Sequence, residues 1–135
     1  MQLQSAHSLA LGSYDRCLRS PRFFARFYER LLASDPSIPP LFARTEFPRQ
    51  YKLLQHGLGL LLSYSSRPDG ELLERIAARH SARGIGVHPS LYPCFVESLI
   101  ATIREHDPHA NAEVERAWRE SLAPGIAFMA ARYAP

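Results

Sequence analysis

His80 is the residue of this sequence whose type and position most directly suggest chemistry. It follows Leu73 by seven positions and Ile76 by four, so on a helix it projects from the apolar face. An inward histidine is most often a core residue whose ring nitrogens are hydrogen-bonded. The alternative is an axial ligand to a buried iron cofactor, because neutral imidazole is a strong iron ligand. Both interpretations stay open at this point.

The number of protein ligands restricts which cofactor His80 would hold. One side chain binds a bare metal ion weakly, whereas a macrocycle with four nitrogens of its own needs only one protein ligand. An inward histidine beside a large apolar slot therefore points to haem. His56 is the other histidine that could be a ligand. It ranks below His80, because it lies on a different helix face from Gln50 and Leu54, two candidate site residues discussed below.

Motifs of self-contained enzymes are missing. The sequence contains no glycine-rich phosphate loop and no G-x-S-x-G, H-E-x-x-H or C-x-x-C pattern. Acidic residues are expected on the polar faces of helices, so no inward pair of carboxylates is predicted. Cys17 and Cys94 lie far apart and are expected to be buried free thiols. The missing motifs and the missing carboxylate pair disfavour a self-contained hydrolase or transferase.

Composition indicates one globular domain over residues 1–135. Hydrophobic residues make up 46% of the chain and charged residues 21%, which is ordinary for a soluble protein. The net charge is +3, but arginines alternate with acidic residues, so a nucleic acid is not an expected partner. No stretch approaches the roughly 20 unbroken apolar residues of a membrane span, so a membrane is not expected either. No basic segment followed by an apolar core opens the chain, which predicts a cytoplasmic protein.

Prolines and glycines divide the chain into six or seven predicted helices without a strand pattern. Ser20 is expected to cap the second helix, with Pro21 as its first residue. Prolines are expected between helices and not inside them. The predicted helices span residues 6–19, 21–34, 48–64, 71–83, 89–106 and 111–133, with a short turn over 37–42. The fold class is therefore all-α.

Several short motifs recur along these helices in a particular order. They are Phe27-Tyr28-Glu29-Arg30-Leu31-Leu32, Pro40-Leu41-Phe42, Gln50-x-x-Leu53-Leu54, Arg79-His80-Ser81 and His88-Pro89-x-x-Tyr92-Pro93. Their order and spacing resemble the globin family, especially bacterial single-domain globins and the haem domain of flavohaemoglobins. The resemblance extends from about residue 14 to residue 133. It implies the globin fold, a sandwich of three helices over three.

The resemblance assigns the candidate site residues. It implies that His80 is the proximal ligand to the iron of haem b (iron protoporphyrin IX), and that Phe42 stacks on the haem. Tyr28 and Gln50 correspond to the distal residues that face a bound gas, and Leu54 walls their pocket. Ile76, Tyr92 and Phe95 complete the expected cofactor-binding set. Without the resemblance, Phe42 and Tyr28 would be core aromatics and Gln50 an exposed residue at a helix start.

Two departures from the flavohaemoglobin pattern concern the support of His80. Tyr92 matches a tyrosine that follows the proximal histidine, but the interval from His80 is longer by a couple of residues. Tyr133 stands where a glutamate is expected in the last helix. Without that carboxylate, electron donation to the iron should be weaker. Peroxidase-like or efficient dioxygenase activity is therefore in doubt.

Two functional interpretations follow from the resemblance. In the first, the protein binds oxygen or nitric oxide at a His80-ligated haem, and works in nitric oxide detoxification or oxygen handling with a separate reductase. In the second, it is a globin-fold sensor or protein-interaction module, with or without haem. Trp118, Tyr133 and the exposed arginines would then serve a helix–helix homodimer.

Overall fold

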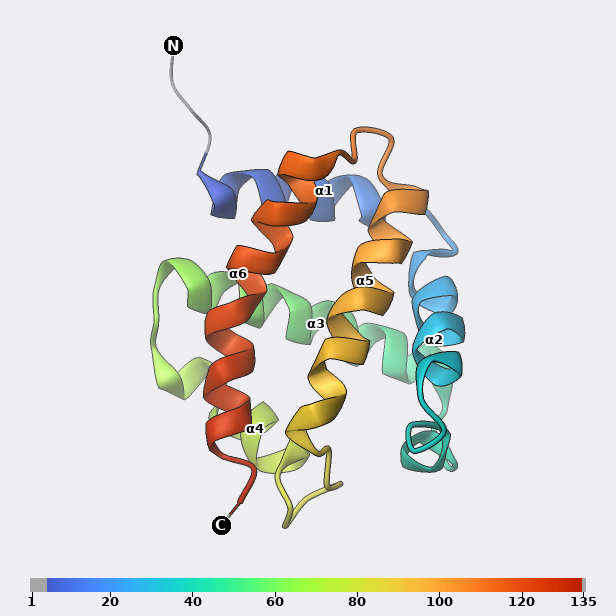
Figure 1. Ribbon diagram of the computed structural model, residues 1–135, viewed down its shortest axis with the longest axis vertical. Coiled ribbons are helices and arrows are strands. Elements are labelled where there is room, and N and C mark those ends of the chain that lie inside the picture. Colours follow the sequence, from blue (N-terminus) through green and yellow to red (C-terminus); the bar gives the residue numbers. More distant parts are fainter. Residues whose placement is uncertain (1–4, 135) are drawn as a thin grey trace.

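The predicted helices form, with small shifts at their ends. The computed structural model describes residues 5–134, within which there is no strand. The six α-helices, shown in Figure 1, are α1 (Ala6–Leu18), α2 (Phe23–Ser34), α3 (Phe47–Ser66), α4 (Glu74–His80), α5 (Tyr92–His106) and α6 (Ala112–Ala131). Three 3-10 turns join them: η1 (Pro39–Phe42), η2 (Gly70–Leu72) and η3 (Pro89–Leu91). None of these helices is long and apolar enough to cross a membrane.

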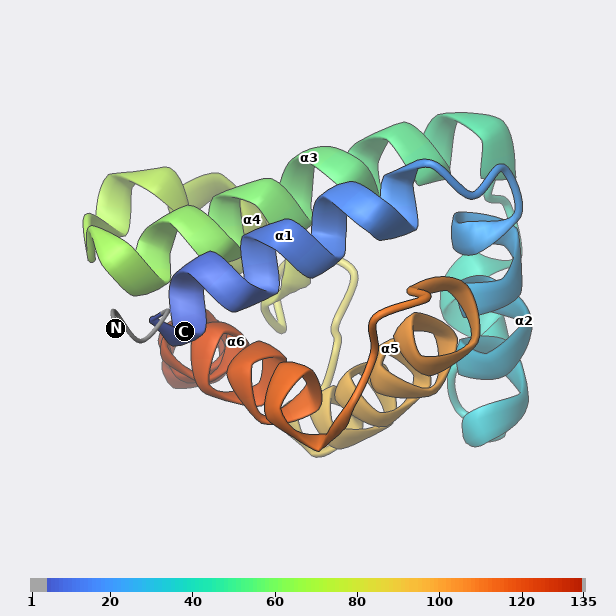
Figure 2. The ribbon, with the colours of Figure 1, turned by 90° about the horizontal axis from the view of Figure 1, so that it is seen from above.

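The helices lie in two layers that cross at an angle. Seen from above, α1 and α3 run together on one side, while α5 and α6 lie together on the other (Figure 2). Helix α2 closes one end by packing on α5, and α6 packs on both α1 and α3. Helix α4 packs on α6 and is not closely packed along α3.

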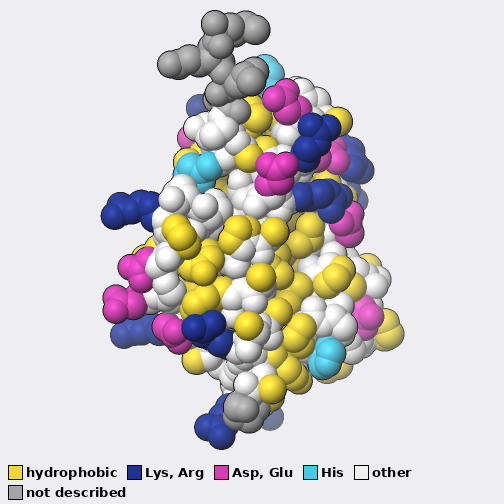
Figure 3. Space-filling model, turned by 60° about the vertical axis from the view of Figure 1, so that its left-hand side comes forward, with side chains coloured by type: hydrophobic (Ala, Val, Ile, Leu, Met, Phe, Trp, Pro, Cys, Tyr) yellow, Lys and Arg dark blue, Asp and Glu magenta, His cyan; other side chains and the backbone are white. Residues whose placement is uncertain are grey.

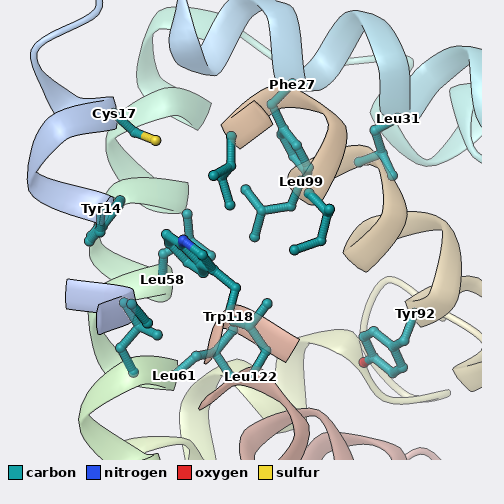
Figure 4. Close-up of a cluster of buried hydrophobic side chains, with 14 of the residues drawn as sticks. Tyr14, Cys17, Phe27, Leu31, Leu58, Leu61, Tyr92, Leu99, Trp118 and Leu122 are labelled. Carbon is teal, nitrogen blue, oxygen red and sulfur yellow. The ribbon is translucent and has the colours of Figure 1, made fainter. Parts of the chain in front are cut away.

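The core lies between the layers and is rich in aromatic rings. Trp118 is fully buried at its centre, among Tyr14, Leu58, Leu99 and Leu122 (Figure 4). The Trp118 ring meets Tyr14 edge-on, with ring centroids 5.8 Å apart. Because Trp118 is fully buried, the prediction that it serves a helix–helix dimer is wrong.

The start of α2 differs from the prediction. Ser20 does not cap this helix, and Pro21 is not its first residue, because α2 begins at Phe23 after Arg22. The Ser20 hydroxyl instead lies 2.7 Å from Nδ1 of His106, at the end of α5. A tertiary hydrogen bond has therefore replaced the expected local cap.

Helix α6 contains a proline, although prolines were expected only between helices. Pro124 lies inside α6, and the Glu120 carbonyl consequently has no amide donor at the usual helical position. The next residue, Gly125, lets α6 approach α3. A methyl group at Gly125 would lie 2.5 Å from Cδ2 of Leu61, so only glycine fits this crossing without a shift.

Asp107 is buried, contrary to the expectation that acidic residues lie on polar helix faces. Its carboxylate accepts hydrogen bonds from Ser13 Oγ at 2.6 Å and Arg16 Nε at 2.6 Å. The Trp118 indole N–H donates to the same Ser13 hydroxyl at 2.9 Å. This network ties α1 to the corner between α5 and α6, on the far side of the core from α4.

Candidate functional site

His80 is the last residue of α4, and one of its ring nitrogens is hydrogen-bonded. Nδ1 lies 2.8 Å from the Ile76 carbonyl oxygen, one turn earlier. A carbonyl only accepts, so Nδ1 carries the proton and donates it. Burial lowers the pKa of His80, although the bond to Ile76 acts in the opposite direction. The ring is therefore neutral at pH 7, with the Nε2 lone pair available to a ligand.

The corner after His80 holds the end of α4 in place. The predicted helix over 71–83 is wrong at both ends, because η2 precedes α4 and α4 stops at His80. The Val87 amide donates to the His80 carbonyl at 2.9 Å, and the Ile85 amide donates to the Arg79 carbonyl at 2.8 Å. These bonds satisfy carbonyls that the helix end leaves open.

Tyr28 and Gln50 meet in space, as the resemblance predicts for a distal pair. Tyr28 is buried on α2, and the Gln50 side-chain amide of α3 donates to its hydroxyl oxygen at 2.9 Å. Because the amide donates, the hydroxyl proton of Tyr28 remains available to another acceptor. Burial raises the pKa of Tyr28 to about 12, so the group stays protonated at neutral pH.

A group of aromatic rings surrounds Tyr28. Phe42 of η1 meets it edge-on with ring centroids 5.5 Å apart, and Phe47 does so at 5.4 Å. Tyr51 stacks on Tyr28 at 5.8 Å. Sequence reasoning named Phe42 but missed Phe47 and Tyr51. The sequence held a signal for them, because Phe47 precedes Pro48 and Tyr51 follows Gln50 at the predicted start of the same helix.

Most of the apolar side chains predicted to line the cofactor site are only partly buried. Phe42, Leu54, Ile76 and Phe95 pack against the core yet stay partly exposed. Helices α3 and α4 approach each other near Ile76, whose Cδ1 would lie 4.0 Å from a methyl group at Gly57. These four side chains leave apolar surface exposed, which a flat apolar cofactor would cover.

The residues expected to support His80, Tyr92 and Tyr133, agree less well with the flavohaemoglobin pattern. Tyr92 is buried, but its hydroxyl makes no hydrogen bond to His80 or to any other residue from 5 to 134. Tyr133 packs its ring on His88 with centroids 5.2 Å apart, and its carbonyl accepts from the Ala82 amide at 2.8 Å. Tyr133 thus lies at the corner after His80 without supplying a carboxylate.

Other possible sites within the described residues are weaker. No cluster of three His, Cys, Asp or Glu side chains is placed to hold a bare metal ion there. A hollow of about 560 Å³ lies between α1 and α3, and another of about 380 Å³ lies between α5 and α6. Neither is lined by His80, Tyr28 or Gln50. Both cysteines are free thiols, but only Cys17 is buried, so the prediction for Cys94 is wrong in this respect.

Comparison with known proteins agrees with the geometry. The family model described as Globin matches residues 25–128. The chain belongs to the globin family. A Pseudomonas aeruginosa PAO1 protein, whose crystal structure is described as structurally highly homologous to a human haemoglobin, is 34% identical to this globin. The match has a TM-score of 0.94 and covers 97% of this chain and 100% of that chain. No curated protein matches the sequence.

Membership of the globin family makes haem the cofactor with which the site residues are compared. The fold is the all-α globin fold that the motifs predicted, and globins generally bind haem. The residues of this globin fit such a group in two respects. His80 presents a neutral ring whose Nδ1 alone is hydrogen-bonded. Phe42, Leu54, Ile76 and Phe95 pack against the core and stay partly exposed.

Proposed function

We propose that this globin binds haem b through His80 and takes a diatomic gas on the side of Tyr28 and Gln50. The observation that carries the proposal is the hydrogen bond from His80 Nδ1 to the Ile76 carbonyl. It fixes the ring orientation and leaves Nε2 as the ligand atom, which is the usual way a protein prepares a histidine for a metal. Phe42, Leu54, Ile76, Tyr92 and Phe95 would hold the macrocycle.

The cationic side chains beside His80 suit the acidic edge of this cofactor. Arg79 and Arg83 flank the proximal histidine, and neither forms an ion pair with another residue in the described part of the chain. Haem carries two propionate groups, which arginine binds through charge-assisted hydrogen bonds. We therefore assign these two arginines to the propionates.

The distal pair would hold a ligand that acquires negative charge. When bound, haem supplies an iron atom that takes up diatomic gases and exchanges electrons. Gln50 donates to the Tyr28 oxygen, so the Tyr28 proton is directed away from Gln50. That proton can be donated to a gas molecule, and charge-assisted hydrogen bonds are roughly twice as strong as neutral ones. Tight retention of oxygen follows from this arrangement.

Retention suits oxygen handling or nitric oxide detoxification more than rapid oxygen transport. Oxidation of nitric oxide by oxygen to nitrate consumes one electron, so a separate reductase must supply it. The test is consumption of nitric oxide in air by the haem-loaded protein with an added flavin reductase. Nitrate should form at the rate at which nitric oxide disappears. A protein that holds oxygen but forms no nitrate would refute the detoxification role and leave oxygen handling.

Replacing Tyr28 with phenylalanine is expected to speed oxygen dissociation about tenfold, a loss of about 1.4 kcal/mol. The variant keeps the ring but removes the donor that faces the gas. Stopped-flow displacement of oxygen by carbon monoxide measures the rate. Tyr51→Phe is the matched control, because Tyr51 stacks on Tyr28 but makes no hydrogen bond within residues 5–134. An unchanged rate in Tyr28→Phe would show that the hydroxyl points elsewhere.

A further inference from the structure

Tyr51 of α3 packs its ring against two aromatic rings of α2. It stacks on Tyr28 with ring centroids 5.8 Å apart and an angle of 27° between the planes. It also stacks on Phe24, with centroids 6.4 Å apart and an angle of 19°. Phe24 and Tyr28 are four residues apart, so they lie on the same face of α2. One side chain of α3 therefore contacts two successive turns of α2.

This contact adjoins the hydrogen bond between Gln50 and Tyr28. Gln50 precedes Tyr51 on α3, and its side-chain amide donates to the Tyr28 oxygen at 2.9 Å. Helix α2 packs mainly on α5 and only slightly on α3, so few contacts fix the spacing that this bond spans. A hydrogen bond weakens steeply when its length or angle departs from the optimum. The Tyr51 ring is therefore well placed to keep Tyr28 and Gln50 in register.

We propose that Tyr51 is a positioning residue for the distal pair, and that its ring sets how strongly oxygen is retained relative to carbon monoxide. It acts through Tyr28, because it covers one face of the Tyr28 ring while Phe42 and Phe47 meet that ring edge-on. The Tyr51 hydroxyl makes no hydrogen bond within residues 5–134, so the ring and not the hydroxyl carries the effect. The gas-binding part of this inference rests on the proposed function.

Oxygen and carbon monoxide should respond differently to a displaced Tyr28. Oxygen acquires negative charge at a haem iron, and a charge-assisted hydrogen bond from the Tyr28 hydroxyl would retain it. Carbon monoxide acquires much less charge, so its release depends little on this donor. A Tyr28 ring that is free to tilt would therefore lose oxygen faster and release carbon monoxide at nearly the wild-type rate.

Two variants of Tyr51 separate its ring from its hydroxyl. Tyr51→Leu removes the ring but keeps an apolar side chain with good helix propensity. Its oxygen dissociation, measured by stopped flow, should be about 3–5 times faster than that of wild type, less than the effect of losing the Tyr28 hydroxyl outright. Carbon monoxide dissociation should change by less than about twofold. Tyr51→Phe keeps the ring and should restore the wild-type rates of both gases.

The approach of Gln50 to Tyr28 can also be measured without a cofactor. In the full chain without added hemin, nuclear Overhauser effects (NOEs) between the Gln50 side-chain amide protons and the Tyr28 ring report this approach. They should be present in wild type and in Tyr51→Phe, and lost in Tyr51→Leu. Because no haem is needed, the NOEs distinguish a failure of the positioning role from a failure of the proposed haem binding.

Phe24→Leu is a second variant, in case Tyr51→Leu does not fold. It removes the other α2 ring on which Tyr51 stacks and leaves Tyr28, Gln50 and Tyr51 in place. The same NOEs should weaken, and oxygen dissociation should be about twofold faster. Circular dichroism checks the helix content of every variant.

Tyr64→Leu is the matched control on the same helix. Tyr64 lies about 20 Å further along α3 than Tyr51 and meets Phe128 of α6 edge-on, with ring centroids 5.5 Å apart. Figure 1 shows α2 and α6 on opposite sides of the molecule, and Figure 3 looks onto the α6 side, where hydrophobic side chains cover the middle. Loss of one ring there should leave both gas rates and the NOEs between Gln50 and Tyr28 unchanged.

Four results would overturn the proposal. NOEs that persist in Tyr51→Leu would show that the ring does not position the distal pair. Lost NOEs with an unchanged oxygen rate would refute the role in gas retention. A Tyr51→Phe chain that behaves like Tyr51→Leu would assign the effect to the hydroxyl. Equal losses in Tyr64→Leu would trace the effect to a general loosening of the fold.

Discussion

Asp107→Ala should lower the free energy of unfolding by about 2–4 kcal/mol, less than for a fully buried pair because Arg16 is partly exposed. The carboxylate is buried and accepts from Ser13, from the Arg16 side chain and from the His109 amide. Its removal leaves these donors without a partner. Urea unfolding followed by circular dichroism measures the loss. Asp15→Ala is the control, because Asp15 is exposed on the same helix as Arg16.

The pH dependence of the Asp107 effect has a defined sign. Burial raises the pKa of Asp107, but the hydrogen bonds from Arg16, Ser13 and the His109 amide outweigh it and hold the pKa below its usual value. A lowered pKa in the folded state gives stability that is complete above the unfolded value of about 3.9. That stability is lost as the pH falls through the folded value. The difference between wild type and Asp107→Ala should therefore shrink below about pH 4. A constant difference down to pH 2 would contradict the assignment.

Gly84→Ala should cost about 2–3 kcal/mol of stability, although it adds one methyl group. That methyl group would lie 2.1 Å from the Arg79 carbonyl oxygen and 2.8 Å from the Ala78 carbonyl oxygen. Both obstacles are backbone atoms, so no side chain can rotate away. The corner that follows His80 must open, and the bond from the Ile85 amide to the Arg79 carbonyl must lengthen or break.

Gly59→Ala is the matched control for the corner variant. It lies inside α3, and a methyl group there meets nothing within 4 Å. Alanine in a helix interior should raise stability by about 0.5–1 kcal/mol. Opposite signs for the two glycines, measured by urea unfolding, would support the tight corner. Equal effects would mean that the Arg79 carbonyl does not crowd Gly84.

Much of the fold was predictable because its information is local. Apolar residues spaced by three and four, with prolines between them, located all six helices. The errors arose where a distant partner decides. Ser20 was expected to cap α2, but it bonds to His106, 86 residues away in the sequence. The burial of Asp107 depends on Ser13 and Arg16, which lie more than 90 residues away.

The candidate site was predictable for a different reason. His80 stood out because a titratable group on an apolar helix face is unusual, and the motifs assigned Tyr28 and Gln50. The hydrogen bond between Tyr28 and Gln50 could not be derived from spacing, since it depends on how α2 crosses α3. The roles of His80 as an iron ligand and of Tyr28 as a donor to a gas stay predictions.

A titration with hemin tests the central claim, that His80 is the protein ligand of a bound haem. The absorption spectrum of wild type should show a strong Soret band that saturates at one hemin per chain. His56→Ala should behave like wild type, because His56 is exposed on α3. His80→Ala should give a weaker or shifted band, and added imidazole should restore it by filling the vacated position. A wild-type chain without a saturating Soret band, or His80→Ala with the wild-type spectrum, would contradict the account.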